Sequence, residues 1–314
     1  MEFLRGIGPY QRITYGDLGL WDDLTEAALA RVIRAARIHS GMPIGIQLSH
    51  AGRKASGGFG KGDPIAPDDV RGWRTVAPSA LPLVEGGPMP EVLDLAGIDR
   101  IVAAFGDAAA RAAAMGLNLI ELHGAHGFLI HQFLSPITNR RTDDYGGNLE
   151  NRMRLSLRVF DAVKAAVPAS VAVGIRISAT DWVEGGWDLD DSIALAKALD
   201  ARDCTYIHVS AGGLDPERQQ LPQLVPGYQL PFAEAIRQRV KMPVVGVGLI
   251  TEPRQAEEAL ATGKADLIAL GRGMLYNPRW PWHAAVELGA SVTAPWQYHA
   301  AAPRASKALF TQTG

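Results

Sequence analysis

We predict an α/β fold, a TIM-type (β/α)8 barrel, from two regularities in the 314-residue sequence. Amphipathic helical segments alternate with short apolar runs rich in β-branched residues, as in parallel strands covered by helices. Histidines, arginines and glycines then follow the carboxyl ends of these strands, and in a barrel such positions converge on one mouth. An open, doubly wound sheet also fits the alternation.

Six helix-then-strand pairs are expected in chain order. The helical patterns cover 24–38, 98–115, 151–167, 189–201, 232–240 and 253–262, and a last helix is expected within 281–288. The strands are expected at 43–48, 118–123, 171–176, 206–209, 243–247 and 266–270, each apolar on both faces. No linker or low-complexity tract divides the chain, so residues 1–314 are expected to form a single domain.

The strand count falls short of the eight that a closed barrel contains. Residues 1–20 show no convincing pair of strands. We therefore expect a barrel that is incomplete at its N-terminus, lacks the usual first two strands and has two unpaired sheet edges.

Composition narrows the range of functions. The chain has 31 basic and 33 acidic residues, a balance that argues against nucleic acid or an anionic membrane as the partner. Cys204 is the only cysteine, which excludes an intrachain disulfide, a cysteine-ligated iron–sulfur cluster and a cysteine-rich zinc site. With neither a signal-peptide pattern nor a membrane-length apolar run, we expect a soluble, cytoplasmic protein.

The segment 121–151 carries the strongest chemical pattern. His123 and His126 leave the end of an expected strand three residues apart, and two imidazoles there can donate paired hydrogen bonds to a carbonyl or nitro oxygen. Two other interpretations remain open. The pair could cap loop carbonyls, or it could bind a metal with His131 as third ligand, although no carboxylate or cysteine is suitably spaced.

Two polar residues interrupt apolar strands. A buried Gln47 amide requires hydrogen-bond partners, which either a polar ring edge or the neighbouring backbone could supply. Arg176 requires an electron-rich ligand or a core carboxylate. Arg53 and Lys54, in the glycine-containing loop after the first expected strand, could meet an anion or be solvated.

Glycines follow the last two expected strands. Gly248 and Gly271 would let backbone N–H groups approach a phosphate, and Arg272 adds a positive charge. Phosphate sites recur after the seventh and eighth strands of barrels, so we predict one here.

Taken together, the strings 45–54 and 121–151, the strand around Arg176 and the Gly271–Arg272 pair resemble the Old Yellow Enzyme family. The similarity is greatest to its bacterial class of FMN-dependent ene-reductases. Residues 12–21 resemble the loop after the family's second barrel strand, so the resemblance spans nearly the whole chain in order.

The resemblance implies FMN at the carboxyl-end mouth of the barrel. It places Gln47 at the pyrimidine edge of the flavin, Arg176 near N1 and O2, and Gly248, Gly271 and Arg272 at the phosphate. It also implies that NAD(P)H reduces the flavin, which then passes hydride to an activated alkene whose carbonyl or nitro oxygen is bound by His123 and His126. The implied partner is a small molecule, and a homo-oligomer is compatible with the family.

The chain departs from the family in three places. Phe128 occupies the position of a tyrosine that donates a proton to the substrate's α-carbon, so water or Tyr228 would have to replace it. Roughly the first 60 residues of the family's barrel have no counterpart, and residues 2–11 diverge where small residues border the flavin. A truncated, flavin-free remnant with a structural or interaction role is therefore the alternative to an enzyme.

Overall fold

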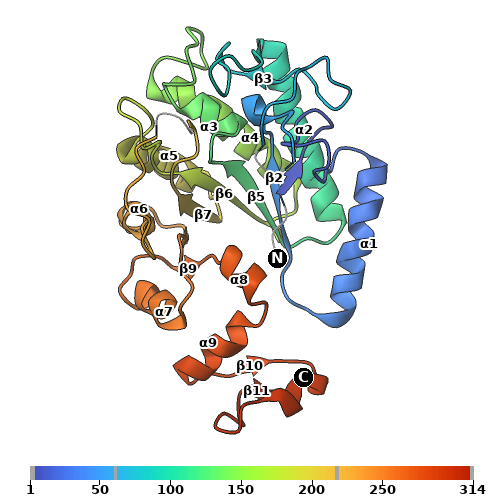
Figure 1. The fold of residues 1–314 in the computed structure, drawn as a ribbon, viewed down its shortest axis with the longest axis vertical. Coiled ribbons are helices and arrows are strands. Elements are labelled where there is room, and N and C mark those ends of the chain that lie inside the picture. The colour runs from blue at the N-terminus through green and yellow to red at the C-terminus, as the bar shows by residue number, and fades with distance from the viewer. Residues whose placement is uncertain (1–3, 60–61, 216–218, 312–314) are drawn as a thin grey trace.

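The computed structural model describes residues 4–59, 62–215 and 219–311 and centres on one parallel sheet (Figure 1). In spatial order its seven strands are β1 (Leu4–Gly6), β2 (Gly45–Ser49), β5 (Leu119–Gly124), β6 (Ala172–Ser178), β7 (Tyr206–Ser210), β8 (Val244–Gly246) and β9 (Leu267–Ile268). This order follows the chain without a reversal, as in a (β/α) barrel, whereas a doubly wound sheet reverses at a switch point.

The six predicted strands are confirmed, with boundaries shifted by a few residues. The sheet also contains β1, inside the region where no pair of strands was expected. Three residues are too few to show a hydrophobic period, and pairing with β2 is what makes this segment a strand. Part of the divergent segment 2–11, residues 2 and 3, lies outside the described residues.

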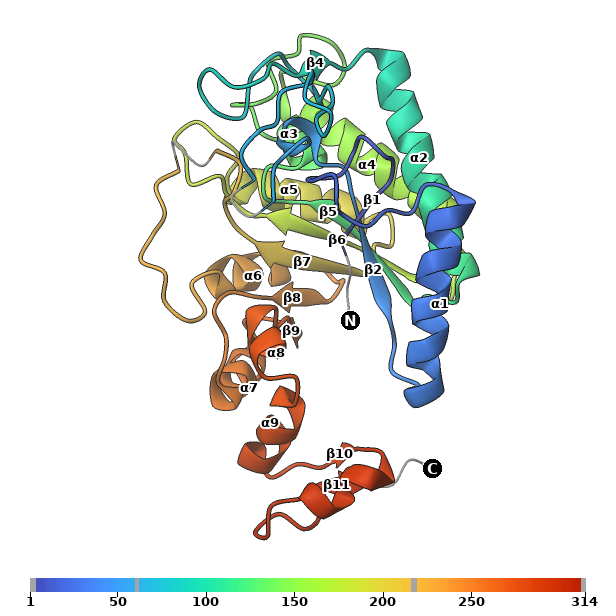
Figure 2. The same ribbon diagram turned by 45° about the vertical axis from the view of Figure 1, so that its right-hand side comes forward.

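Helices follow the strands, and most of them lie on one side of the sheet, while the last one extends away from it (Figures 1 and 2). They are α1 (Asp23–His39), α2 (Leu95–Ala114), α3 (Leu129–Leu134), α4 (Leu149–Ala166), α5 (Leu189–Asp200), α6 (Leu230–Arg237), α7 (Pro253–Ala261), α8 (Arg272–Tyr276) and α9 (Trp280–Leu288). The seven predicted helices are confirmed, while α3 and α8 were not predicted, because one or two turns carry little periodicity.

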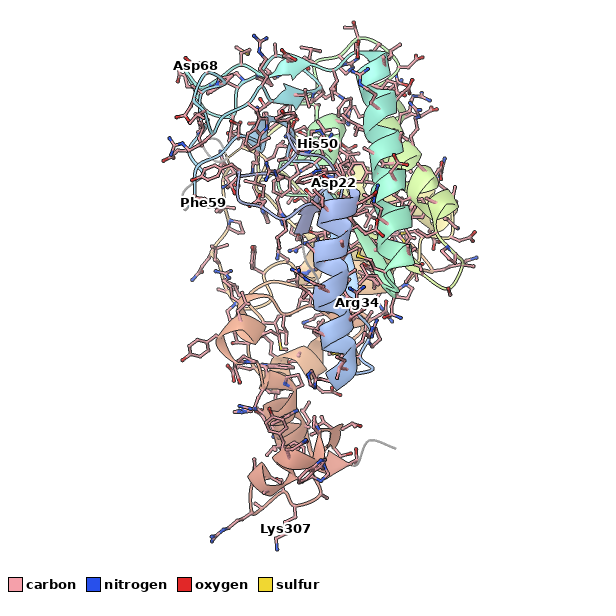
Figure 3. All side chains as sticks on the ribbon, turned by 90° about the vertical axis from the view of Figure 1, so that its right-hand side faces the viewer. Asp22, Arg34, His50, Phe59, Asp68 and Lys307 are labelled. Atoms are coloured by element: carbon pink, nitrogen blue, oxygen red, sulfur yellow. The ribbon has the colours of Figure 1, made fainter. Side chains whose placement is uncertain are left out.

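Short polar side chains cap the long helices. Figure 3 shows Asp22 at the start of α1, where its carboxylate accepts from the Thr25 N–H and the Thr25 hydroxyl completes a capping box. Asp94, Asn148 and Asp188 cap α2, α4 and α5, each with a side-chain oxygen that accepts from a backbone N–H of the first turn. These caps satisfy backbone donors that the first turn of a helix leaves unpaired.

The two faces of the sheet differ in polarity, so the prediction that each strand is apolar on both faces was wrong. Alternate residues such as Leu122 and Ile175 point toward the helices, where they form one core with Phe105 and Phe160. The opposite face carries polar side chains at paired positions, namely Gln47, Glu121, His123, Arg176 and His208. Burial on this face is tolerated because several of these groups bond to one another.

The sheet is the wall of a TIM-type barrel that does not close within the described residues. In the part of the chain that the structure describes, β1 pairs with β2 alone and β9 with β8 alone, so these two strands form the ends of the sheet. The polar face borders a hollow of about 420 Å³ near the amino ends of the strands, with Leu119, Tyr206 and Leu267 in its wall. The expectation of an incomplete barrel thus agrees with the observed sheet, but the expected six strands were one too few, because β1 adds a seventh among the described residues.

Two smaller units complete the fold. The paired strands β3 (Val76–Ala77) and β4 (Glu91–Val92) lie in the long connection between β2 and α2. After α9, the strands β10 (Val292–Thr293) and β11 (Phe310–Thr311) form a second pair beyond the main sheet (Figure 2). Among the described residues, no helix has both the length and the apolar character needed to cross a bilayer.

The helix-side core yields a stability prediction. Phe105 of α2 is fully buried, so Phe105→Ala should lower the free energy of unfolding by about 3–5 kcal/mol through lost burial and a cavity. Leu95→Ala is the matched control, because Leu95 lies on the same helix but is 56% exposed. Urea denaturation followed by circular dichroism would test this, and equal midpoints for the two variants would contradict it.

Candidate active site

Strand register gathers the predicted polar residues at one edge of the sheet. His123, Arg176 and His208 are successive Cα partners on β5, β6 and β7. Two residues further on, Ser178 and Ser210 are partners at the ends of β6 and β7. Because all strands run in one direction, the loops that leave these ends lie at the same mouth.

The structure brings the two predicted histidines together. The ring centroids of His123 and His126 are 5.2 Å apart, with the rings nearly perpendicular. His126 has a φ of +54° and Gly127 a φ of +74°, so the chain makes a left-handed turn directly after β5. This turn, costly for a non-glycine residue, places the second imidazole beside the first.

Local hydrogen bonding determines the proton position on His123. Its Nδ1 accepts from the Ala125 N–H at 3.3 Å, so the neutral ring carries its proton on Nε2. Burial, followed by the electrostatic effects of His126 and Arg176, lowers the pKa of His123 well below 6.5. At neutral pH His123 is therefore an uncharged Nε2–H donor.

His126 is held at three points. Its backbone N–H donates to Ser178 Oγ at 3.0 Å, its Nε2 lies 2.9 Å from Ser210 Oγ, and its carbonyl accepts from Lys54 Nζ at 2.7 Å. Burial and the charge of Arg176 lower the pKa of His126 well below 6.5. This imidazole is also neutral at physiological pH.

Lys54 links the loop after β2 to this turn. Its ammonium donates to the carbonyls of both His126 and Gly213, and burial, followed by the charge of Arg53, lowers its pKa to about 8. Arg53 donates to the carbonyls of Pro82 and Leu214. The prediction that Lys54 is solvated or meets an anion was wrong, because its ammonium is buried and donates to two backbone carbonyls.

His131 holds the backbone of the turn and does not form a ligand cluster with His123 and His126. Its Nδ1 accepts from the Gly127 N–H at 3.0 Å, and its Nε2 lies 2.8 Å from Asp181 Oδ1 without the alignment of a hydrogen bond. Both side chains are fully buried, and Asp181 Oδ2 accepts from Ser135 and the Trp187 N–H. The described part of the chain contains no cluster of three His, Cys, Asp or Glu side chains suited to a metal.

A cavity of about 400 Å³ opens beside His126 and contains most of the predicted cofactor residues. Its walls include His126, Arg176, Tyr228, Gly248, Gly271 and Arg272. Arg176 Nε is buried and has no hydrogen-bond partner among the described residues, which leaves it available to an electron-rich ligand atom. Gly248 has a φ of +134°, and a Cβ there would approach Gln229 Nε2 to 2.9 Å, so only glycine fits this wall. These features fit a nucleotide with an electron-rich ring and a phosphate.

Gln47 does not line this cavity. Its amide donates to Glu121 Oε1, and Glu121 Oε2 lies 3.0 Å from His208 Nδ1. The partner of the buried amide is thus a side chain on the next strand, which neither sequence interpretation anticipated. Contact of Gln47 with a flavin edge stays a prediction.

Phe128 forms an aromatic wall next to His123. The two ring centroids are 4.5 Å apart in an edge-to-face arrangement, and Lys54 Nζ lies 5.8 Å from the Phe128 centroid.

Sequence reasoning missed Ser178, Ser210 and Asp181. The serines carried a usable signal, since Ser210 directly follows the expected strand 206–209 and Ser178 lies two residues beyond the expected strand 171–176.

The chain is similar in sequence to known oxidoreductases. A family model described as NADH:flavin oxidoreductase / NADH oxidase matches residues 6–290. NADPH dehydrogenase of Geobacillus thermodenitrificans is 42% identical over 293 residues, which make up 93% of this chain and 80% of that protein.

Solved structures give the same result. Morphinone reductase in complex with tetrahydroNAD superposes with a TM-score of 0.71 at 30% identity, covering 100% of this chain and 82% of its own. The old yellow enzyme homologue from Zymomonas mobilis has a TM-score of 0.71 at 27% identity, covering 99% and 82%. The chain therefore belongs to the NADH:flavin oxidoreductase / NADH oxidase family, that of Old Yellow Enzyme, and is an FMN-dependent NAD(P)H oxidoreductase.

Proposed function

We propose that this oxidoreductase reduces the activated C=C bond of an α,β-unsaturated carbonyl or nitro compound. The observation that carries the proposal is the pair of neutral, buried imidazoles, of which His126 lines the cavity with Arg176 and His123 lies beside His126. Similarity to a solved structure named morphinone reductase supports the proposal that this protein is a reductase. We further propose that residues 1–314 act as one flavin-binding unit.

The cavity supports a definite placement of the cofactor. Arg176, with its unpartnered Nε, would face the electron-rich edge of the flavin ring. Gly248, Gly271 and Arg272 would hold the phosphate with backbone N–H groups and a guanidinium. When bound there, FMN would supply the hydride chemistry that links oxidation of NAD(P)H to reduction of the activated C=C bond.

The histidines would bind and polarise the substrate oxygen. A hydrogen bond from His123 Nε2–H draws electron density toward that oxygen and makes the β-carbon more electrophilic. The same donor stabilises the negative charge that develops on the oxygen as hydride arrives. Because both rings are neutral, the site supplies this stabilisation without a change in its own charge.

The α-carbon also needs a proton, which Phe128 cannot donate. Tyr228 is one candidate source of this proton, since it lines the same cavity as His126 and Arg176. Water entering the cavity is the other source. A phenol positioned beside the flavin would give the faster transfer, because positioned acids accelerate such steps by roughly 10²–10⁴-fold.

Removal of the imidazoles tests the proposed function. His123→Ala and His126→Ala should each lower kcat/KM for 2-cyclohexenone by roughly 10²-fold, the usual cost of losing one oxyanion donor. Flavin reduction by NADPH, followed by stopped-flow absorbance, should change far less. His39→Ala is the control, because His39 lies at the exposed end of α1. Unchanged turnover in both active-site variants would exclude this substrate class.

The FMN placement has its own test. Arg176→Met should weaken FMN binding by roughly 10–100-fold, because it removes a charged hydrogen-bond donor from the flavin edge. Titration of apoprotein by flavin fluorescence quenching measures the dissociation constant. Arg254→Met provides the matched control at an arginine that is 74% exposed. Equal affinity in the two variants would contradict the placement.

The proton source can be tested by exchanging hydroxyls between two positions. Phe128→Tyr should accelerate re-oxidation of the reduced enzyme by 2-cyclohexenone, by roughly tenfold or more, because it adds an acid beside His123. Tyr228→Phe should slow the same half-reaction if its phenol is the source. No gain from Phe128→Tyr, measured by stopped-flow absorbance, would show that proton supply does not limit the rate.

A further inference from the structure

Two serines at the carboxyl ends of neighbouring strands contact the same histidine in different ways. Ser178 ends β6, Ser210 ends β7, and the two are register partners, each 1% exposed. Ser178 Oγ binds the main chain of His126 at 3.0 Å, whereas Ser210 Oγ lies 2.9 Å from Nε2 of its ring.

The Ser178 hydroxyl has one fixed arrangement. Its oxygen accepts from the His126 N–H, which can only donate, and its proton goes to the Gly212 carbonyl at 2.8 Å. Ser178 therefore holds the backbone of the turn and has no influence on where the imidazole carries its proton.

The Ser210 hydroxyl has a choice between two acceptors. The Ile177 carbonyl lies 3.0 Å from Oγ and His126 Nε2 lies 2.9 Å away, yet a hydroxyl has a single proton to donate. If Ser210 donates to Ile177, Nε2 must carry the imidazole proton and Nδ1 can only accept. If Ser210 donates to Nε2, the imidazole proton is on Nδ1, which becomes a donor.

We propose that Ser210 is a positioning residue that selects the tautomer of His126, donating to Nε2 when a substrate oxygen is bound so that Nδ1–H donates to that oxygen. The inference rests on the proposed function, in which His126 lines the substrate cavity. The ring loses its Nε2 proton and gains one on Nδ1 by exchange with water, so its charge does not change. His123 needs no such partner, since the Ala125 N–H already determines its tautomer.

The tautomer can be observed directly in the oxidised holoenzyme, where 2-cyclohexenone binds without turnover. Two-bond ¹H–¹⁵N spectra of histidine-labelled protein distinguish a protonated from an unprotonated ring nitrogen. In the wild type, adding 2-cyclohexenone should move the His126 signals to the Nδ1–H pattern. Ser210→Ala should prevent this shift and weaken 2-cyclohexenone binding by roughly tenfold, about the value of one hydrogen bond.

Two further variants separate tautomer selection from a general loosening of the turn. Ser178→Ala removes the neighbouring hydroxyl and should keep the Nδ1–H pattern in the bound state, even if binding weakens. Ser210→Thr retains a hydroxyl and should restore both the pattern and the affinity. It also serves as the folded test case, with FMN content as the check on folding, should Ser210→Ala be unstable.

The outcomes are distinguishable. An Nδ1–H pattern that persists in Ser210→Ala, or that is lost in a folded Ser210→Thr, overturns the role of Ser210 and leaves the proposed function intact. Loss of the Nδ1–H pattern in Ser178→Ala also overturns the role of Ser210, because the tautomer of His126 would then depend on the conformation of the whole turn. A wild-type His126 whose tautomer does not change when 2-cyclohexenone binds overturns the role of Ser210 and leaves the proposed function intact. Failure of the wild-type holoenzyme to bind 2-cyclohexenone at all, followed by flavin absorbance, overturns both proposals.

Discussion

The backbone ladder joining β5, β6 and β7 is the constraint on which the site depends. Parallel pairing places His123, Arg176 and His208 side by side and aligns Ser178 with Ser210. A shift of one residue in any of these strands would turn its polar side chains toward the helices and its apolar ones toward the mouth. The apolar core around Phe105 and Phe160 opposes such a shift, so the same packing that stabilises the fold also sets the chemistry at the mouth.

Burial of the two imidazoles determines which chemistry the mouth of the barrel can support. It keeps both imidazoles uncharged, which favours their use as hydrogen-bond donors over their use as acids. An uncharged donor next to the Arg176 guanidinium also avoids repulsion between like charges in a confined space. The positive charge of Arg176 remains available to a ring that gains electrons.

The helix–strand alternation could be predicted because each long helix shows its apolar stripe and each buried strand its apolar run. β1 and α3 could not, since three to six residues carry too little periodicity and depend on tertiary pairing. At the site, histidine and glycine motifs after strand ends predicted five residues that share one cavity: His126, Arg176, Gly248, Gly271 and Arg272. The partner of Gln47 was out of reach, because Glu121 meets it only through the register of β2 with β5.

Lys54 couples three loops at the mouth of the barrel through hydrogen bonds. Its ammonium belongs to the loop after β2, and its two carbonyl acceptors, on His126 and Gly213, belong to the loops after β5 and β7. None of these three segments can swing outward alone without breaking a bond to a buried cation. A bulky ligand would therefore have to displace all three loops together. We expect the three loops to open in one concerted motion and not independently.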